Sequence, residues 1–229
     1  MNDARVGGRG GRSSGVAGEV WLRTPRPHRA APPLTRDRIV TEAVALLDED
    51  GALGLTMRRL AERLGAGPTT LYWHVRTKDD VLDLALDTIF GDVGLPAASG
   101  DWTADVRALI GDWYAVMLRH RWAPGLLGRP MLGPNVLART EFLQAALARG
   151  GFAGTALAVA THGLANYVIG SALTRVGGGT LNAADQHVRA HAEEYPTLAA
   201  TGHLAEQDWD ALFDAGLDSF LAGLIASRR

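Results

Sequence analysis

The side chains with the clearest potential for chemistry stand together in residues 55–78, LTMRRLAERLGAGPTTLYWHVRTK. Hydroxyl, phenol, indole and imidazole groups follow a short glycine-rich turn, on Thr69, Thr70, Tyr72, Trp73 and His74. Threonine can bond a base edge or touch a thymine methyl group, and tyrosine and histidine can reach phosphates or bases. Five cations bracket this run and can grip a DNA backbone: Arg58, Arg59, Arg63, Arg76 and Lys78. The stretch therefore indicates recognition of double-stranded DNA.

Two short helices must position these side chains. Thr56 is a good N-cap for a helix over 57–64, in which Leu60, Ala61 and Leu64 share one face. A glycine turn follows, and Pro68 suits the first turn of a second helix that runs to about residue 74. Leu71 and Val75 then point inward and the polar run points outward, which predicts a helix-turn-helix whose second helix enters the major groove. The alternative is an ordinary helical hairpin, for which a Thr-Thr-x-Tyr-Trp-His face is a poor core.

Helices on both sides support this motif. Residues 34–50 form a helix capped by Thr35, with an inner stripe of Ile39, Ala43, Leu46 and Leu47. Thr77 can cap a further helix with Val81, Leu84, Ala85 and Ile89 in register, which connects the motif to the rest of the chain.

The remaining chain predicts more helices and no strand, so the expected fold is all-α. Helices are expected over 102–120 (capped by Asp101), 136–149, 155–175, 183–194 and from the Asp208 cap onward, with a Gly/Pro-broken segment at 121–135 and a loop at 195–207. The nearly uncharged helix 155–175 is expected to be buried on several faces. The predicted domains are a tail (1–33), a helix-turn-helix DNA-binding domain (34–80) and a helical ligand-binding and dimerisation domain (81–229).

Composition sets limits on compartment and charge. The chain has 229 residues, 47% of them apolar, and no cysteine, so it has no disulfide, thiol nucleophile or thiolate metal site. No apolar run has transmembrane length, and we expect a cytoplasmic protein without a membrane partner. The net charge of −2 divides into +4 for residues 1–33, −1 for 34–80 and −5 beyond, so basic charge supports DNA binding by its placement. Residues 1–33 are expected to be disordered, with a DNA-contacting arginine arm as the alternative.

The stretch LTMRRLAERLGAGPTTLYWHVRTKDDVLDLAL resembles the DNA-binding domain of the tetracycline repressor (TetR) family. The run Leu71 to Val75, followed by Lys78, is the most specific part of the resemblance, which is strong over about residues 34–90 and fainter beyond. By this resemblance, side chains that match operator-contacting positions are those of Arg58, Thr70, Tyr72, Trp73, His74 and Lys78. Pro68 and Thr69 depart from the glutamine–proline pair of the tetracycline repressor. Because glutamine can bond adenine bidentately and proline cannot, we expect a different operator sequence.

The resemblance also implies a homodimer and a small-molecule effector. The two most apolar helices, 155–175 and 208–226, are expected to form the dimer interface, with filling of a monomer core as the alternative. In repressors of this type an effector binds among the C-terminal helices, shifts the connecting helix and releases DNA. The coupling energy is on the order of 1–3 kcal/mol.

The expected pocket differs from that of the tetracycline repressor. A histidine in the broken loop and an acid near the end of the long helix would be needed to hold a magnesium–drug chelate, but Leu126, Leu127 and about Thr174 stand there. Only Gly128, Arg129 and Pro130 echo that loop. The predicted pocket residues are mostly apolar or aromatic: Leu109, Trp113, Met117, Leu126, Met131, Phe142, His162, Asn166 and Tyr167. They indicate a bulky, largely hydrophobic effector, with no metal and no cofactor, although each residue could be ordinary core.

Three alternatives remain open. An enzyme is the first, because His187 and His191 could share one helix face as zinc ligands, but no third ligand is placed and the HExxH order is absent. We expect no enzyme. A DNA-binding regulator without a small-molecule ligand is the second, and an activator instead of a repressor is the third.

Overall fold

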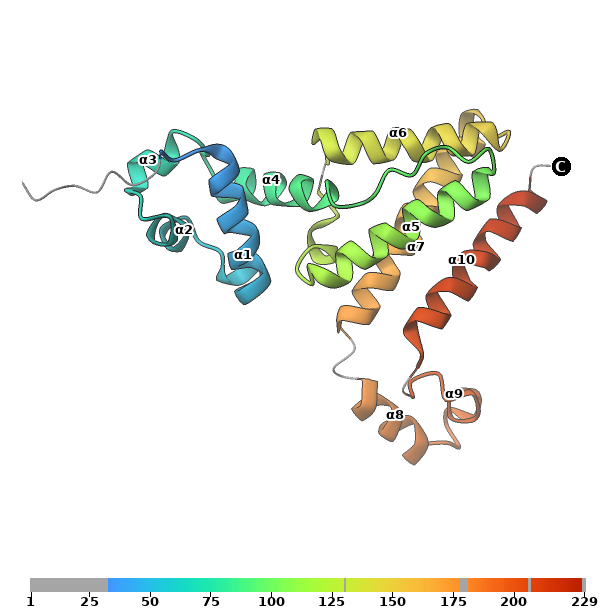
Figure 1. Cartoon of the computed structure of the whole chain (residues 1–229). Coiled ribbons are helices and arrows are strands. Elements are labelled where there is room, and N and C mark those ends of the chain that lie inside the picture. The colour runs from blue at the N-terminus through green and yellow to red at the C-terminus, as the bar shows by residue number, and fades with distance from the viewer. Residues whose placement is uncertain (1–32, 130, 178–180, 206, 228–229) are drawn as a thin grey trace, which may run out of the picture. The chain divides into compact units, whose positions relative to one another are not determined.

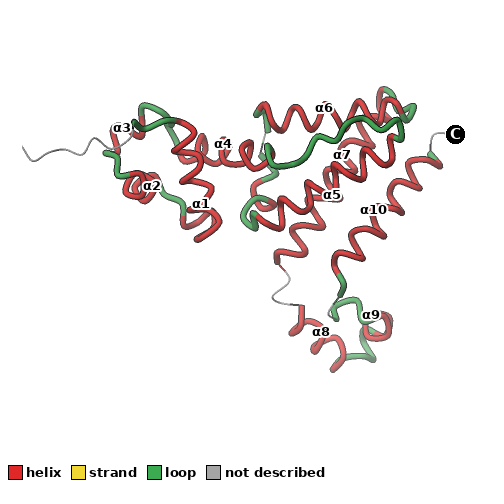
Figure 2. Tube along the Cα trace, viewed as in Figure 1, coloured by secondary structure: helices red, strands yellow, loops and turns green. Residues whose placement is uncertain are grey.

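The computed structural model describes residues 33–129, 131–177, 181–205 and 207–227, and Leu34–Arg229 belong to one compact unit. Helices joined by loops account for the described residues, which contain no strand (Figures 1 and 2). The all-α prediction is therefore confirmed. The expected disordered tail and the alternative arginine arm lie outside the described residues.

Ten α-helices and one short 3₁₀ turn follow one another along the described chain. They are α1 (Arg36–Gly54), α2 (Met57–Leu64), α3 (Pro68–Tyr72), α4 (Lys78–Phe90), α5 (Trp102–Arg119), η2 (Pro124–Leu126), α6 (Pro134–Arg149), α7 (Gly154–Gly177), α8 (Leu181–Ala190), α9 (Pro196–Thr201) and α10 (Trp209–Ala226).

Side-chain caps begin most of the long helices, as the sequence predicts. Thr35, Thr56, Asp101 and Asp208 each accept a hydrogen bond from a backbone N–H in the first turn of the helix that follows. Thr77 forms a reciprocal capping box with Asp80, with bonds of 3.0 and 3.1 Å. The Arg76 backbone N–H also donates to Asp80, at 2.8 Å, and is the main reason that the pKa of this carboxyl is lowered. The start of α4 is thus firmly defined.

Apolar stripes on α1, α2 and α4 pack into the core of the N-terminal part. Ile39, Ala43, Leu46 and Leu47 are fully buried on α1, as predicted. On the partner helices the buried side chains include Leu60, Leu64, Leu71, Val81, Ala85 and Ile89. The core continues into α5, α6 and α7, which pack on one another and enclose Val106, Leu109, Ile110, Leu147 and Leu164.

Several predicted boundaries and one predicted loop are wrong. The first helix is an exception: Gly51 has non-helical backbone angles (φ 68°, ψ −178°) that interrupt α1 directly after Asp50, where the sequence predicts its end, and one further turn runs to Gly54. The second helix of the motif ends at Tyr72, two residues earlier than predicted. The helix expected over 183–194 is α8, which begins at Leu181 and ends at Ala190. The segment 195–207 contains α9, which begins with a proline at N1 and ends at Gly202 (φ 59°).

The expectation that the long apolar helix α7 is buried on several faces is also wrong for this chain alone. Only one stripe is buried, made of Ala160, Thr161, Leu164, Val168 and Ala172. By length and composition α7 could cross a membrane, as core helices of other proteins also could, and 28% of its apolar window is buried here. Leu157, Tyr167 and Ile169 beside this stripe are partly buried, and the remaining face is exposed although it carries few charges.

Candidate nucleic-acid interface and ligand cavity

The turn between α2 and α3 has the geometry of a helix-turn-helix. Gly65 takes a left-handed conformation (φ 62°) that a residue with a side chain would adopt only at a cost, and so ends α2. The Ala66 N–H bonds the Ala61 carbonyl at 3.0 Å, which closes the turn. Pro68 opens α3, whose one buried side chain is Leu71, at 0% exposure. A single leucine therefore anchors this short helix, and Val75 anchors the turn that follows.

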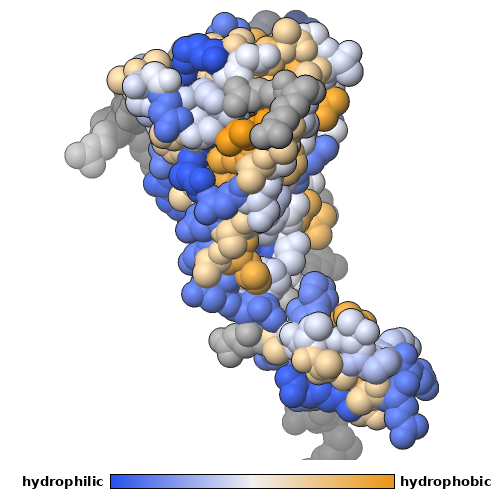
Figure 3. All heavy atoms as spheres, turned by 90° about the vertical axis from the view of Figure 1, so that its right-hand side faces the viewer, coloured by the Kyte–Doolittle hydropathy of each residue, from blue (hydrophilic) through white to orange (hydrophobic). Residues whose placement is uncertain are grey.

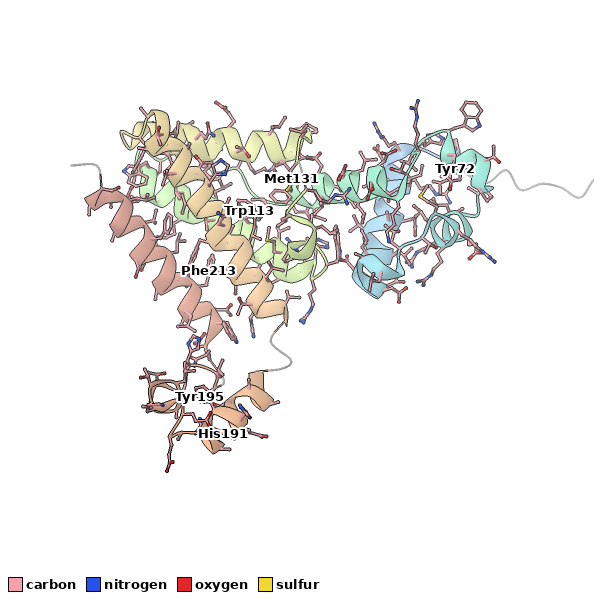
Figure 4. All side chains as sticks on the ribbon, turned by 180° about the vertical axis from the view of Figure 1, so that it is seen from behind. Tyr72, Trp113, Met131, His191, Tyr195 and Phe213 are labelled. Carbon is pink, nitrogen blue, oxygen red and sulfur yellow. The ribbon has the colours of Figure 1, made fainter. Side chains whose placement is uncertain are left out.

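The polar run faces solvent as predicted. Exposed side chains project from α3 and its end, with Trp73 85% and Tyr72 50% accessible, and Thr69, Thr70 and His74 also exposed. Tyr72 is marked in Figure 4. Large aromatic groups in water are costly unless they meet a partner, and here they surround three hydrogen-bonding groups. The outward orientation is confirmed, and the contacts with DNA remain predictions.

Most of the surrounding cations already have partners within the protein. Arg58 pairs with Glu62 at 2.9 Å, and Arg63 bonds both Glu49, at 2.5 Å, and Glu42, at 2.9 Å. The bond to Glu49 is the main cause of the raised pKa of Arg63. The pairs of Arg63, with Arg59–Asp50 at 2.5 Å, fasten α2 to α1, whereas the Arg58–Glu62 pair lies within α2.

Lys78 is also engaged, since its Nζ donates to the Ala52 carbonyl at 2.7 Å. Among the predicted DNA-binding residues, Lys78 is thus half-buried and tied to the end of α1, whereas Arg58 is exposed. A phosphate contact by Lys78 would require this bond to be exchanged.

A cavity of about 310 Å³ lies among α4, α5, α6, α7 and the loop before α6. Five of the nine predicted pocket residues line it, namely Leu109, Trp113, Met131, His162 and Asn166. Trp113 and Met131, from α5 and the loop, are labelled in Figure 4. The remainder of the lining is mainly apolar and includes Phe90, Leu127, Val136, Leu143, Ala165 and Ile169.

The other four predicted pocket residues do not line this cavity. Met117 is fully buried in the core, and Leu126 and Phe142 are partly buried against it. Tyr167 lines a shallow groove between α7 and α10, where its hydroxyl donates to the Phe213 carbonyl at 2.6 Å. Helical rotation explains the difference, because Tyr167 lies about 100° around the helix from Asn166. Thr174 lines the same groove, so the chelate position of the tetracycline repressor is not repeated in the cavity.

Two cavity residues that the sequence prediction missed are arginines. Arg129 and Arg139 both line the cavity, and no local pattern distinguishes them from solvated surface arginines. Their partners lie 46–50 residues away in sequence, apart from Asn135 beside Arg139, so contacts could not be inferred from spacing.

The connecting helix α4 is held along its length by groups of the C-terminal part. Arg129 bonds Asp83 at 2.9 Å and Asp79 at 3.0 Å, and the bond to Asp79 contributes most to raising the pKa of Arg129. Asp87 accepts hydrogen bonds from the backbone N–H groups of Asn135, at 2.9 Å, and Val136, at 3.1 Å. A carboxylate of α4 thus caps the N-terminus of α6, where it meets orphan donors and a favourable helix dipole.

Replacement of Asp87 by alanine is expected to lower the free energy of unfolding by about 1–2 kcal/mol. The substitution leaves two α6 N–H donors without their acceptor and removes a negative charge from the positive end of that helix. Urea denaturation followed by circular dichroism measures the change. The matched control is Asp92→Ala, at an exposed position just after α4, which should stay within about 0.5 kcal/mol of the parent. Equal stability of the two variants would contradict a capping role for Asp87.

A second connection joins α1 to the segment after α5. Asp48 Oδ1 lies 2.8 Å from His120 Nδ1 and accepts a 2.7 Å bond from Trp122 Nε1. His120 and Trp122 are both buried. The N-terminal part is therefore fixed to the C-terminal part through α1 as well as α4.

His187 on α8 and His191, the residue directly after it, do not assemble a metal site in the described residues. The rings of His187 and His191 lie 4.3 Å apart, but no group of three or more potential ligands is found in the described part of the chain. The ring of His191, which is labelled in Figure 4, instead has its Nδ1 2.9 Å from the His187 carbonyl oxygen.

Apolar side chains are exposed on neighbouring surfaces of α7 and α10. Val159 (63%) and Leu173 (46%) are exposed on α7, and Leu212 (48%) on α10. The two helices pack closely at glycines, because a Cβ built on Gly163 would lie 2.5 Å from Phe220 and one on Gly216 would lie 2.3 Å from the Tyr167 hydroxyl. Figure 3 shows apolar residues among polar ones on the side of the molecule that carries α10. A surface of this kind is typical of a protein–protein interface.

Comparison with known proteins matches both parts of the chain. Residues 39–85 match the family model described as "Bacterial regulatory proteins, tetR family", and residues 95–228 match "Tetracyclin repressor-like, C-terminal domain". An HTH-type transcriptional regulator of Saccharopolyspora erythraea is 46% identical over 223 residues, which cover 94% of each chain. The HTH-type transcriptional repressor DrrR1 of Streptomyces coeruleorubidus is 35% identical over 69% of this chain and 60% of its own length.

Solved structures show the same fold. The protein ActR of Streptomyces coelicolor, in complex with (S)-DNPA, superposes with a TM-score of 0.77 at 32% identity, over 86% of this chain and 99% of that one. The same protein in complex with actinorhodin gives a TM-score of 0.77 at 30% identity, over 85% and 97%.

Proposed function

The chain belongs to the TetR family of bacterial transcriptional regulators, and we propose that it is a repressor that binds a palindromic operator as a homodimer and is released by a small molecule. Proteins of this family are regulators and not enzymes, as predicted. A regulator of this kind works on chromosomal DNA, so we place it in the cytoplasm.

The exposed polar run on α3 carries the proposal for DNA binding. Thr69, Thr70, Tyr72, Trp73 and His74 form the surface that would enter the major groove, and Arg58 and Lys78 would contact phosphates. The proposed DNA-binding domain comprises residues 34–80. Exchange of the Lys78–Ala52 bond for a phosphate would free Lys78 from the end of α1 for contact with DNA.

The exposed apolar surface of α7 and α10 supports the proposal of a homodimer. If two copies bury this surface against each other, their two α3 helices can bind two DNA half-sites that lie roughly 34 Å apart. The cavity supports a small-molecule effector, which favours this function over a DNA-binder without a ligand. Its largely apolar lining suits a bulky hydrophobic compound. A transcription assay with the regulated promoter distinguishes a repressor from an activator.

Operator binding is tested with a labelled duplex from the DNA upstream of the gene. Tyr72→Ala and His74→Ala are each expected to weaken specific binding by roughly 1–3 kcal/mol, because each removes a reading contact. Fluorescence anisotropy at two salt concentrations measures the affinity, which should fall as salt rises. Tyr195→Ala replaces an exposed tyrosine outside α3 and should leave affinity unchanged. Unchanged affinity in both Tyr72→Ala and His74→Ala would refute this reading surface.

A further inference from the structure

The charged lining of the cavity has one sign. Arg129 and Arg139 line it together with His162, whereas the described lining contains no aspartate or glutamate. A cationic ligand would find no counter-charge there and would meet two fixed positive charges. An anionic ligand would find two guanidinium groups, each with several donors in a plane.

Both arginines already hold α4 or the residues directly after it. Arg129 bonds Asp79 and Asp83 in the first half of the helix. Arg139 donates to the Gly91 carbonyl at 2.7 Å and to the Val93 carbonyl at 2.7 and 2.9 Å, just past its end. The two arginines of the described lining therefore also hold α4, the helix that connects the helix-turn-helix to the rest of the chain.

Arg129 can exchange its present partners for a ligand more easily than Arg139 can. Arg129 also lines a second pocket, of about 610 Å³, whose lining includes Asp79 and Asp83. These carboxylates are exposed, at 71% and 54%, so water can solvate them if the arginine leaves. Arg139 has more partners than Arg129 and they are mostly backbone carbonyls, of Gly91, Val93 and Asn135, with the Asn135 side chain in addition, so Arg139 is expected to stay in place.

We propose that the effector carries an anionic group on an apolar, aromatic body, and that this group binds Arg129 in competition with Asp79 and Asp83. This inference rests on the proposed function, in which the cavity is the effector site. Because a carboxylate or sulfonate inside the cavity is less solvated than one on the surface, it is the stronger acceptor. Loss of the two α4 contacts then frees the first half of α4, next to the reading head.

Two dyes of nearly identical shape test the charge preference. The anion 8-anilino-1-naphthalenesulfonate and the neutral N-phenyl-1-naphthylamine share one apolar body and both fluoresce when they are buried. The parent protein is expected to bind the anionic dye about tenfold more tightly in a fluorescence titration, because a charge-assisted hydrogen bond is added. Arg129→Gln should remove this preference and leave the affinity for the neutral dye within about twofold, which also reports an intact cavity.

Substitutions on α4 are expected to change the affinity for the anionic dye in the opposite direction to Arg129→Gln. Asp79→Asn with Asp83→Asn removes the competitors of the anionic dye and should raise its affinity about threefold, whereas a merely structural role for Arg129 would not. Ala165→Trp fills the cavity and should abolish binding of both dyes. The proposal is overturned by equal affinities for the two dyes, by a preference that survives Arg129→Gln, or by anionic dye that still binds to Ala165→Trp. The titrations contain no DNA, so failure of operator binding is a separate result.

Discussion

Replacement of Gly170 by arginine is expected to convert the protein into a monomer and to lower its operator affinity by roughly 10²–10⁴-fold. Gly170 lies on the exposed side of α7, and a Cβ built there has no neighbour within 4 Å in the chain. The first side-chain atom of an arginine at this position therefore meets no atom of its own copy, and the rest of the side chain can extend from the exposed side of α7 into solvent. In the proposed dimer it would place a long charged side chain between closely packed helices.

The loss of affinity follows from the loss of the second half-site. When two reading heads are joined, binding of the first raises the effective concentration of the second, and a monomer forfeits this gain. The protomer itself should remain folded, because arginine has a better helix propensity than glycine by up to about 1 kcal/mol. The variant therefore tests assembly into a dimer without a loss in the stability of the protomer.

Light scattering after size-exclusion chromatography measures the mass, and anisotropy with the upstream DNA measures the affinity. Gly111→Arg on α5 is the matched control, since Gly111 also has no atom within 4 Å of a built Cβ and belongs to neither α7 nor α10. It should remain dimeric at micromolar concentration. A Gly170→Arg protein that is still dimeric would exclude this surface as the interface.

The sequence predicts the caps and the reading motif well because those signals are local. Thr56, Thr77 and Asp101 each act on a backbone N–H two or three residues away, so their types and positions alone identify a helix start. The inner stripe of α1 follows from helical periodicity in the same way. The helix α9 carried equally local signals, Pro196 and Gly202, which could have identified it.

Burial of α7 and the lining of the cavity depend on long-range packing. An uncharged helix has the same sequence pattern whether it is covered by its own chain or by a second copy, so the exposed face of α7 could not be predicted. The connecting role of Arg129 depends on Asp79 and Asp83, which lie 50 and 46 residues away. The residue types of Met117 and Tyr167 predict a place in the pocket, but helix rotation directs these side chains elsewhere.

Replacement of Leu71 by alanine is expected to lower the free energy of unfolding by about 2–5 kcal/mol, the range for a buried leucine in a well-packed core. Leu71 is fully buried and is the one buried residue of α3, so the truncation leaves a cavity directly beneath the reading helix. The five residues of this helix cannot hold a helical conformation by propensity alone. We therefore expect operator affinity to fall further than in Tyr72→Ala, because all reading side chains lose their fixed orientation together.

Leu53→Ala supplies the matched control for this substitution, since Leu53 is 96% exposed at the end of α1. The same atoms are removed, but no buried contact is lost, and stability should stay within about 0.5 kcal/mol of the parent. Urea denaturation of the three proteins gives the stabilities, and anisotropy with the upstream DNA gives the affinities. If Leu71→Ala retained the stability of Leu53→Ala and bound the operator normally, α3 would have to be positioned by contacts other than its single buried leucine, and the reading head described above would be wrong.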